Sequence, residues 1–273
     1  MLKQRLVTAF FLLLGMGWAL FYTTANQWHV IVAIIALFSF WEWAQLGRFS
    51  RLETYSYLLL TAVCYAVIEI LFAHSHIPFV LNILAILFWL IVAPLWLKNL
   101  WHIENKWGHA LLGWLLLFST MFSLAVIKQS GAIQLLLLLI IIWLSDSAAY
   151  FTGKAIGKHK LAPSISPGKT WEGVTGALVM VCLYGIFLQF FWPWTELPLI
   201  GWIKNHQFNF YTLLIVIAIL GIQGDLFESW LKRCVGVKDS GFILPGHGGV
   251  LDRIDALIAT LPVMAIWTES LVR

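Results

Sequence analysis

Charged side chains are scarce in this sequence. Of its 273 residues, 11% are Asp, Glu, Lys or Arg, whereas 61% are hydrophobic. An ordinary soluble domain is about a quarter charged, so this chain has too few charged residues to cover the surface of a water-soluble core. The composition therefore excludes a soluble protein with a single core.

Cysteine is scarce as well. The three cysteines, Cys64, Cys182 and Cys234, lack the spacing of a metal site, and the first two lie in apolar runs. This number excludes a disulfide scaffold, and a cysteine in an apolar run is a small buried hydrophobe. The patterns Gly-x-Ser-x-Gly and His-Glu-x-x-His are missing, which argues against serine hydrolysis and zinc proteolysis.

Long apolar runs are abundant. The mean hydropathy is +0.87, and the runs approach the roughly 20 residues that a helix needs to cross hydrocarbon. The runs do not alternate as porin strands do, so helices rather than a barrel satisfy the backbone in lipid. We expect an all-α fold, a polytopic integral membrane helix bundle. About nine transmembrane helices are predicted, at residues 6–22, 28–46, 57–73, 79–97, 109–127, 131–151, 173–194, 209–228 and 254–271.

The distribution of Lys and Arg predicts the orientation, because cytoplasmic loops carry an excess of both. With the N-terminus in the cytoplasm, only Lys128, Lys204 and Arg273 of the 17 Lys and Arg residues fall on the outer side. The first run comes after Lys3 and Arg5 as a signal peptide would, but a second span begins at once and favours an uncleaved helix.

Two predicted cytoplasmic loops, 152–172 and 229–253, are longer and more polar than most other connections. Long polar loops on a rigid scaffold commonly carry function. We therefore expect an N-terminal region of four spans, 1–108, and a catalytic transmembrane region of five spans, 109–273, which holds both loops.

Acidic residues lie in or beside the predicted spans, close to the cytoplasmic face. Such residues are costly in a membrane and are functional candidates. Carboxylates from neighbouring helices make a site suited to Mg²⁺, which prefers one or two carboxylates together with water and phosphate. Interhelical salt bridges with Lys232, Arg233 and Arg253 are the structural alternative. The aspartates concerned are Asp146, Asp225, Asp252 and Asp255.

Glycines and basic residues fill both loops. Gly248 and Gly249 precede a predicted helix start, where backbone N–H groups can bind an anion. Lys169 comes after a Pro-Gly pair and opens the seventh helix, which favours a phosphate-binding role. The triplet 168–170 is not a P-loop, because Pro163 stands where the first glycine belongs. Attraction to anionic lipid explains three further lysines equally well: Lys154, Lys158 and Lys160.

The segment 229–255 reads Ser-x-Leu-Lys-Arg-x4-Lys-Asp-x-Gly-x2-Leu-Pro-x-His-Gly-Gly-Val-x-Asp-Arg-Ile-Asp. It resembles, at every fixed position, the defining pattern of the bacterial phosphatidate cytidylyltransferases, also called CDP-diacylglycerol synthases. The segments 146–150 and 166–173 are similar to the other polar segment of that family. Roughly the first 100 residues hold no motif of this kind.

The resemblance implies that CMP passes from CTP to phosphatidate, giving CDP-diacylglycerol and pyrophosphate for phospholipid synthesis. It implies Mg²⁺ with K⁺ beside it, a homodimer, and a site on the cytoplasmic side of a bacterial inner membrane; no nucleic acid is expected as a partner. A lipid phosphate is already an anionic nucleophile, so the reaction needs charge neutralisation and alignment more than a base. We predict Asp225 and Asp252 as metal ligands. The other predicted site residues are Asp146, Lys169, Ser229, Lys232, Arg233, Lys238, Asp239, His247, Arg253 and Asp255, of which the basic ones would hold phosphates.

Other functions fit less well. A CTP-dependent lipid kinase is the nearest alternative, but the complete 229–255 pattern argues against it. An alcohol phosphotransferase is disfavoured because Asp-x2-Asp-Gly-x2-Ala-Arg is missing. A transporter would place its site near the membrane midplane, whereas the acids and lysines here gather at one face. Glu42 and Glu69 have no partner nearby in the sequence, so a structural hydrogen bond explains them at least as well as catalysis.

Overall fold

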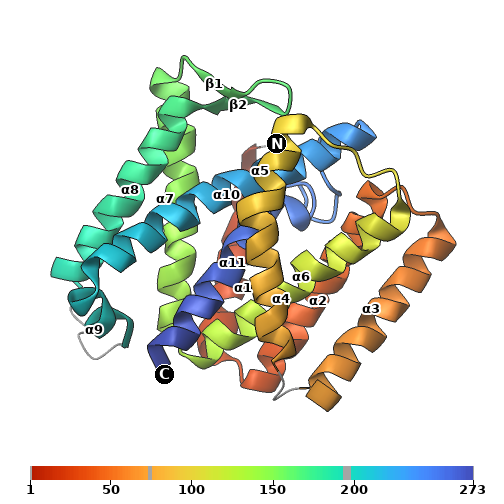
Figure 1. The fold of residues 1–273 in the computed structure, drawn as a ribbon, viewed down its shortest axis with the longest axis horizontal. Coiled ribbons are helices and arrows are strands. Elements are labelled where there is room, and N and C mark those ends of the chain that lie inside the picture. The colour runs from red at the N-terminus through yellow and green to blue at the C-terminus, as the bar shows by residue number, and fades with distance from the viewer. Residues whose placement is uncertain (1, 73–75, 193–197, 273) are drawn as a thin grey trace.

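The computed structural model describes residues 2–72, 76–192 and 198–272, and almost all of its regular structure is helical (Figure 1). Eight described segments are long and apolar enough to cross a membrane, and Val7–Tyr22 adds a shorter apolar helix where the first span is predicted. The predicted polytopic helix bundle is therefore confirmed. The elements are α1 (Leu2–Tyr22), α2 (Ala25–Leu46), α3 (Arg51–Phe72), α4 (Ile77–Leu87), the π-helical turn η1 (Phe88–Val92), α5 (Ala93–Asn99), α6 (Lys106–Gln129), α7 (Ala132–Ile156), β1 (Lys160–Ala162), β2 (Ser166–Thr170), α8 (Trp171–Phe190), α9 (Pro198–Asn205), α10 (Gln207–Val235) and α11 (Leu251–Val272).

The centre of the bundle lies around α11, which packs against α10, α6 and α4. Leu261, Met264 and Ala265 of α11 are fully buried there. The neighbouring pair α7 and α8 runs side by side along one flank, and α3 lies at the opposite flank (Figure 1). Because α3 turns apolar side chains such as Leu59 and Ile70 outward, this flank is suited to contact with lipid.

The span predicted at 79–97 is one membrane-length segment, but its helix is interrupted by η1. Pro94 lies just after this turn. Proline has no N–H group and displaces the carbonyl one turn earlier, which disturbs the hydrogen-bond ladder of a helix. The Trp89 carbonyl accepts a hydrogen bond from Gln223 Nε2 of α10 at 2.6 Å. The interruption thus joins this span to the helix that carries Asp225.

Helices extend beyond the membrane ends that hydropathy predicts. The helix α10 continues to Val235, where Gly236 adopts a φ of +78° and its N–H donates to the carbonyls of Arg233 and Lys232. Part of the predicted loop 152–172 is the end of α7 and an antiparallel hairpin of β1 and β2. Hydropathy marks where the apolar environment ends, whereas a helix ends where a residue such as glycine caps it.

The helices α10 and α11 cross closely at Gly224. A Cβ atom there would overlap the Asp255 carbonyl oxygen and lie 3.0 Å from the Cβ of Ala259. We expect Gly224→Ala to push the two helices apart and to destabilise the protein by about 1–3 kcal/mol. Thermal unfolding in detergent measures this loss.

Gly15→Ala is the matched control, because nothing lies within 4 Å of a Cβ atom at Gly15 of α1. Alanine is also the better helix former, so this variant should unfold at the wild-type temperature or slightly above it. Equal unfolding temperatures for Gly224→Ala and the wild type would contradict the close crossing.

Candidate active site

The polar residues gather at one end of the bundle, where α7 and α10 end and α8 and α11 begin. The β-hairpin lies at this end (Figure 1). The hairpin is attached to α10 by Arg233, whose Nε donates to the Ile165 carbonyl at 3.3 Å. The two polar segments found in the sequence therefore lie side by side.

A first cluster joins three carboxylates to a lysine. Lys169 of β2 places its Nζ 2.8 Å from Asp225 Oδ2 and donates to the Ile222 carbonyl at 3.1 Å. Asp146 on α7 and Asp255 on α11 each interact electrostatically with Asp225 and Lys169. These four side chains come from four elements and together carry excess negative charge when ionised. Such a cluster is suited to a further cation.

The carboxylate of Asp225 is the accessible member of an ion pair. Its side chain is 41% exposed, whereas that of Lys169 is 21% exposed. Ser229, one helical turn later, donates its hydroxyl to Asp225 Oδ1 at 3.2 Å. The helical spacing of Asp225 and Ser229 therefore brings them together as the sequence predicts.

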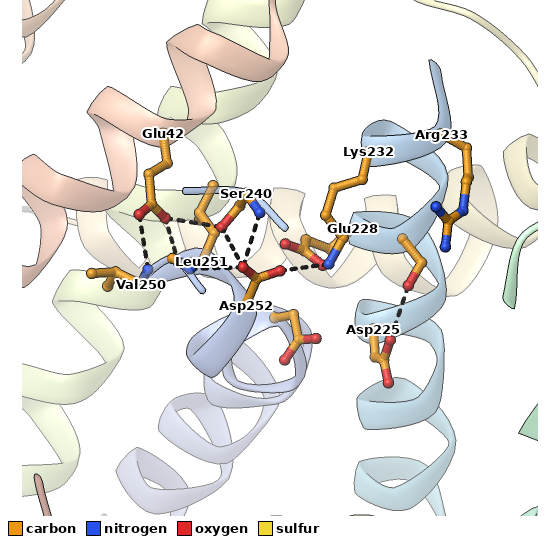
Figure 2. A network of polar contacts seen from close by, with 12 residues as sticks. Glu42, Asp225, Glu228, Lys232, Arg233, Ser240, Val250, Leu251 and Asp252 are labelled. Carbon is orange, nitrogen blue, oxygen red and sulfur yellow. Dashed lines mark hydrogen bonds and ion pairs between the residues drawn. The ribbon is translucent and has the colours of Figure 1, made fainter. Parts of the chain in front are cut away.

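A second cluster, whose charged side chains are largely buried, is drawn with Asp225 of the first in Figure 2. Lys232 forms ion pairs with Glu228 and with Asp252, the latter at 2.5 Å between Nζ and Oδ1. Asp252 Oδ2 also accepts hydrogen bonds from Ser240 N at 2.9 Å, Ser240 Oγ at 3.0 Å and Gly249 N at 2.8 Å. Both oxygens of Asp252 are thus occupied by groups of the protein, which fits an orienting role better than direct metal binding.

The remaining predicted residues lie nearer the surface. Lys238, Asp239 and Arg253 are exposed. The His247 backbone N–H donates to the Leu244 carbonyl at 2.9 Å. Its ring Nδ1 is buried without a hydrogen-bond partner among the described residues. The structure therefore brings Asp146, Lys169, Asp225 and Asp255 together but shows no contact that ties these four to Lys238 or Arg253 in the part of the chain it describes.

The sequence analysis assigned Glu42 no site role, and in the structure this residue is fully buried on α2. Its carboxylate accepts hydrogen bonds from Ser240 Oγ, Val250 N and Leu251 N, at 3.1, 2.9 and 2.8 Å (Figure 2). The sequence feature that could have identified Glu42 is an acid near the end of an apolar span. Glu69, the other unassigned acid, has its Oε1 atom 3.6 Å from His29 Nδ1. Among the described residues it makes no hydrogen bond to the loop 236–250 that joins α10 to α11.

Residues 3–271 match the family model of the cytidylyltransferases. The chain belongs to the cytidylyltransferase family. It is 34% identical to a phosphatidate cytidylyltransferase of Haemophilus influenzae over 96% of each chain, and 34% identical to one of Pseudomonas aeruginosa over 99% of this chain and 98% of the relative. A relative of the same name from Staphylococcus haemolyticus is 42% identical over 51% of this chain and 50% of its own.

The chain is therefore an enzyme of the nucleotidyltransferase class. In the described parts of the chain, no three His, Cys, Asp or Glu side chains form a ready metal site. Mg²⁺ does not need one, because it commonly takes one or two carboxylates and completes its shell with water and substrate phosphate. The exposed carboxylate of Asp225, with Asp255 and Asp146 around it, fits this requirement.

Proposed function

We propose that this cytidylyltransferase transfers CMP from CTP to phosphatidate, giving CDP-diacylglycerol and pyrophosphate. The relatives from Haemophilus influenzae and Pseudomonas aeruginosa, which align over nearly their whole length, carry the name phosphatidate cytidylyltransferase. The observation that carries the proposal is the ion pair of Lys169 with Asp225, surrounded by Asp146 and Asp255 at one end of a membrane helix bundle. A cluster of positively and negatively charged side chains at this end of the bundle suits the binding of phosphates and a metal ion better than helix packing.

The reaction forms a bond between a phosphatidate oxygen and the α-phosphorus of CTP, and it breaks the bond from that phosphorus to the bridging oxygen of pyrophosphate. The attacking oxygen is already ionised, so no side chain has to remove its proton. The protein must align two anions and stabilise the charge that develops on the leaving group. In this proposal, Lys169 and Arg233 bind phosphate oxygens. Lys238 and Arg253 are exposed and add positive charge without a direct contact to the Lys169 cluster in the described structure.

Asp225 is the proposed ligand of Mg²⁺, with Asp255 or Asp146 as the second carboxylate. The bound ion would neutralise phosphate charge and polarise the phosphoryl group that is attacked. Ser229 orients Asp225 through its hydroxyl. In this proposal, Asp252 orients the loop 236–250 by accepting hydrogen bonds from Ser240 and Gly249; its role as a metal ligand stays a prediction. K⁺ binds beside Mg²⁺ in this proposal.

The site belongs, in this proposal, to the cytoplasmic side of a bacterial inner membrane. CTP would arrive from water, and phosphatidate would enter from the bilayer with its acyl chains still in lipid. A cysteine introduced at Lys158, an exposed position next to the hairpin, should react with an impermeant reagent only from the cytoplasmic side. Reaction only from outside would contradict this orientation.

The proposed homodimer is tested by the mass of the protein in detergent.

Purified protein in detergent tests the activity. Given CTP, phosphatidate and Mg²⁺, it should release pyrophosphate in equal amount to CDP-diacylglycerol identified by mass. Removing either phosphatidate or Mg²⁺ should stop both products, and adding K⁺ tests the second ion. Release of CDP together with a newly phosphorylated lipid alcohol would identify a kinase instead.

A further inference from the structure

Glu42 connects the N-terminal half of the chain to the loop 236–250, which joins α10 to α11. It lies near the end of α2, and none of its surface is exposed to solvent. Its oxygen Oε1 accepts from Val250 N at 2.9 Å, and Oε2 accepts from Leu251 N at 2.8 Å. Figure 2 shows the carboxylate above the start of α11. A buried acid is thus paired with backbone donors more than 200 residues away.

These contacts cap α11. The first N–H groups of a helix have no partner within it, and the helix dipole makes that end favourable for negative charge. Glu42 satisfies Val250 and Leu251, while Asp252 satisfies Gly249. Of the two glycines whose N–H groups the sequence offered to an anion, Gly249 therefore donates to a carboxylate of the chain itself.

Two loop glycines make room for the Glu42 side chain. A Cβ atom at Gly241 would lie 2.9 Å from Glu42 Cδ and closer still to Oε1. A Cβ atom at Gly249 would lie 2.6 Å from Oε1 and would also overlap the Ser240 hydroxyl. Real Cβ atoms do not approach other atoms this closely, so the loop can wrap around Glu42 only because glycine stands at both positions.

Ser240 links Glu42 to the buried cluster. Its hydroxyl oxygen lies 3.1 Å from Glu42 Oε2 and 3.0 Å from Asp252 Oδ2. A hydroxyl has one proton to donate, so the two carboxylates share it. Asp252 in turn holds Lys232. Movement of Glu42 would therefore displace Asp252, and it would displace Asp255 through the start of α11.

Other N-terminal residues contact the same loop. Thr8 of α1 donates its hydroxyl to the Pro245 carbonyl at 3.1 Å, and the Trp41 ring meets the Phe242 ring edge to face. Arg48 donates to the Cys234 carbonyl at 3.1 Å, just before the loop. Among these contacts, the hydrogen bonds of Glu42 have an acceptor that is both buried and charged. Hydrogen bonds to a charged group are stronger than those between neutral groups.

We propose that Glu42 is a positioning residue for cytidylyl transfer. It holds the loop 236–250 and the start of α11. Asp252 thereby keeps its place beside Lys232, and Asp255 keeps its place beside Asp225 and Lys169. This role rests on the proposed function, since it concerns the geometry of that site. Glu42 touches no substrate; its effect passes through Ser240 and the capped helix end.

The variant Glu42→Gln tests this role, because it keeps the side-chain size but replaces one acceptor oxygen with an NH₂ group that faces N–H donors. We expect kcat to fall by at least about tenfold, while the KM for CTP changes less than about threefold. Hydrogen–deuterium exchange should be faster at residues 250 and 251, with little change elsewhere. Glu42→Asp keeps the carboxylate and should recover part of kcat. Glu69→Gln is the matched control, and both readouts should stay at wild-type values.

An unchanged kcat in Glu42→Gln, or unchanged exchange at residues 250 and 251, would overturn the proposal. So would faster exchange along the whole chain with a lower unfolding temperature and a normal kcat per folded molecule, because this pattern describes a purely structural role. A wild-type protein that forms no CDP-diacylglycerol would instead overturn the proposed function. The exchange measurement still decides whether Glu42 holds the loop in that case.

Discussion

Replacing Asp225 with asparagine is expected to lower kcat by at least about a hundredfold, the scale of losing one preorganised electrostatic contact in a transition state. Asparagine keeps the shape of the side chain but removes the negative charge that pairs with Lys169 at 2.8 Å. It also removes the accessible carboxylate that is proposed to bind Mg²⁺. Steady-state turnover of CTP and phosphatidate measures the loss.

Glu53→Gln is the control for this prediction. Glu53 also pairs with a lysine, Lys106, at 2.7 Å, but both side chains are 45% exposed and lie outside the clusters of the site. This variant should turn over like the wild type. An Asp225→Asn protein that folds and keeps wild-type turnover would contradict the roles proposed for Asp225.

Replacing Lys232 with methionine is expected to destabilise the protein by about 3–5 kcal/mol, because breaking a buried ion pair leaves charge without compensation. Lys232 lies between Glu228 and Asp252, and the three side chains are 11%, 6% and 6% exposed. Apart from this ion pair, both oxygens of Glu228 lack a hydrogen-bond partner in the described structure. Unfolding in detergent measures the loss.

Two further variants show whether the loss of stability comes from breaking a buried ion pair or from removing any lysine. Lys106→Met breaks an exposed pair and should leave the unfolding temperature close to that of the wild type. The double variant Lys232→Met with Glu228→Gln should regain part of the lost stability, since it removes one of the uncompensated charges. Wild-type stability in Lys232→Met would show that the buried cluster does not depend on its lysine.

Features that depend on helix periodicity and hydropathy are predicted well by the sequence. Membrane spans are recognisable because hydrocarbon requires long apolar helices, and Ser229 lies beside Asp225 because they are one turn apart. The end of α10 is less predictable, since hydropathy does not report that the helix continues to Val235, seven residues beyond the predicted span, and is capped there by Gly236.

Contacts between distant segments could not be predicted from the sequence. Lys169 reaches Asp225 through a hairpin that hydropathy presents only as a polar loop. Glu42 reaches Ser240 across 198 residues, and only the packing of α2 against the loop brings them together. The region 1–108 holds no recognised motif, yet Thr8 and Glu42 in it contact the motif-bearing loop. The division of the chain into an N-terminal region, 1–108, and a catalytic region, 109–273, stays a prediction.

The phosphorus atom of CTP that enters the lipid distinguishes nucleotidyl transfer from phosphorylation. Purified protein is given phosphatidate and CTP labelled with radioactive phosphorus at either the α- or the γ-phosphate. Nucleotidyl transfer predicts that α-label enters the lipid and γ-label leaves as pyrophosphate. Label from the γ-phosphate in the lipid, with none from the α-phosphate, would contradict the account and make the enzyme a lipid kinase.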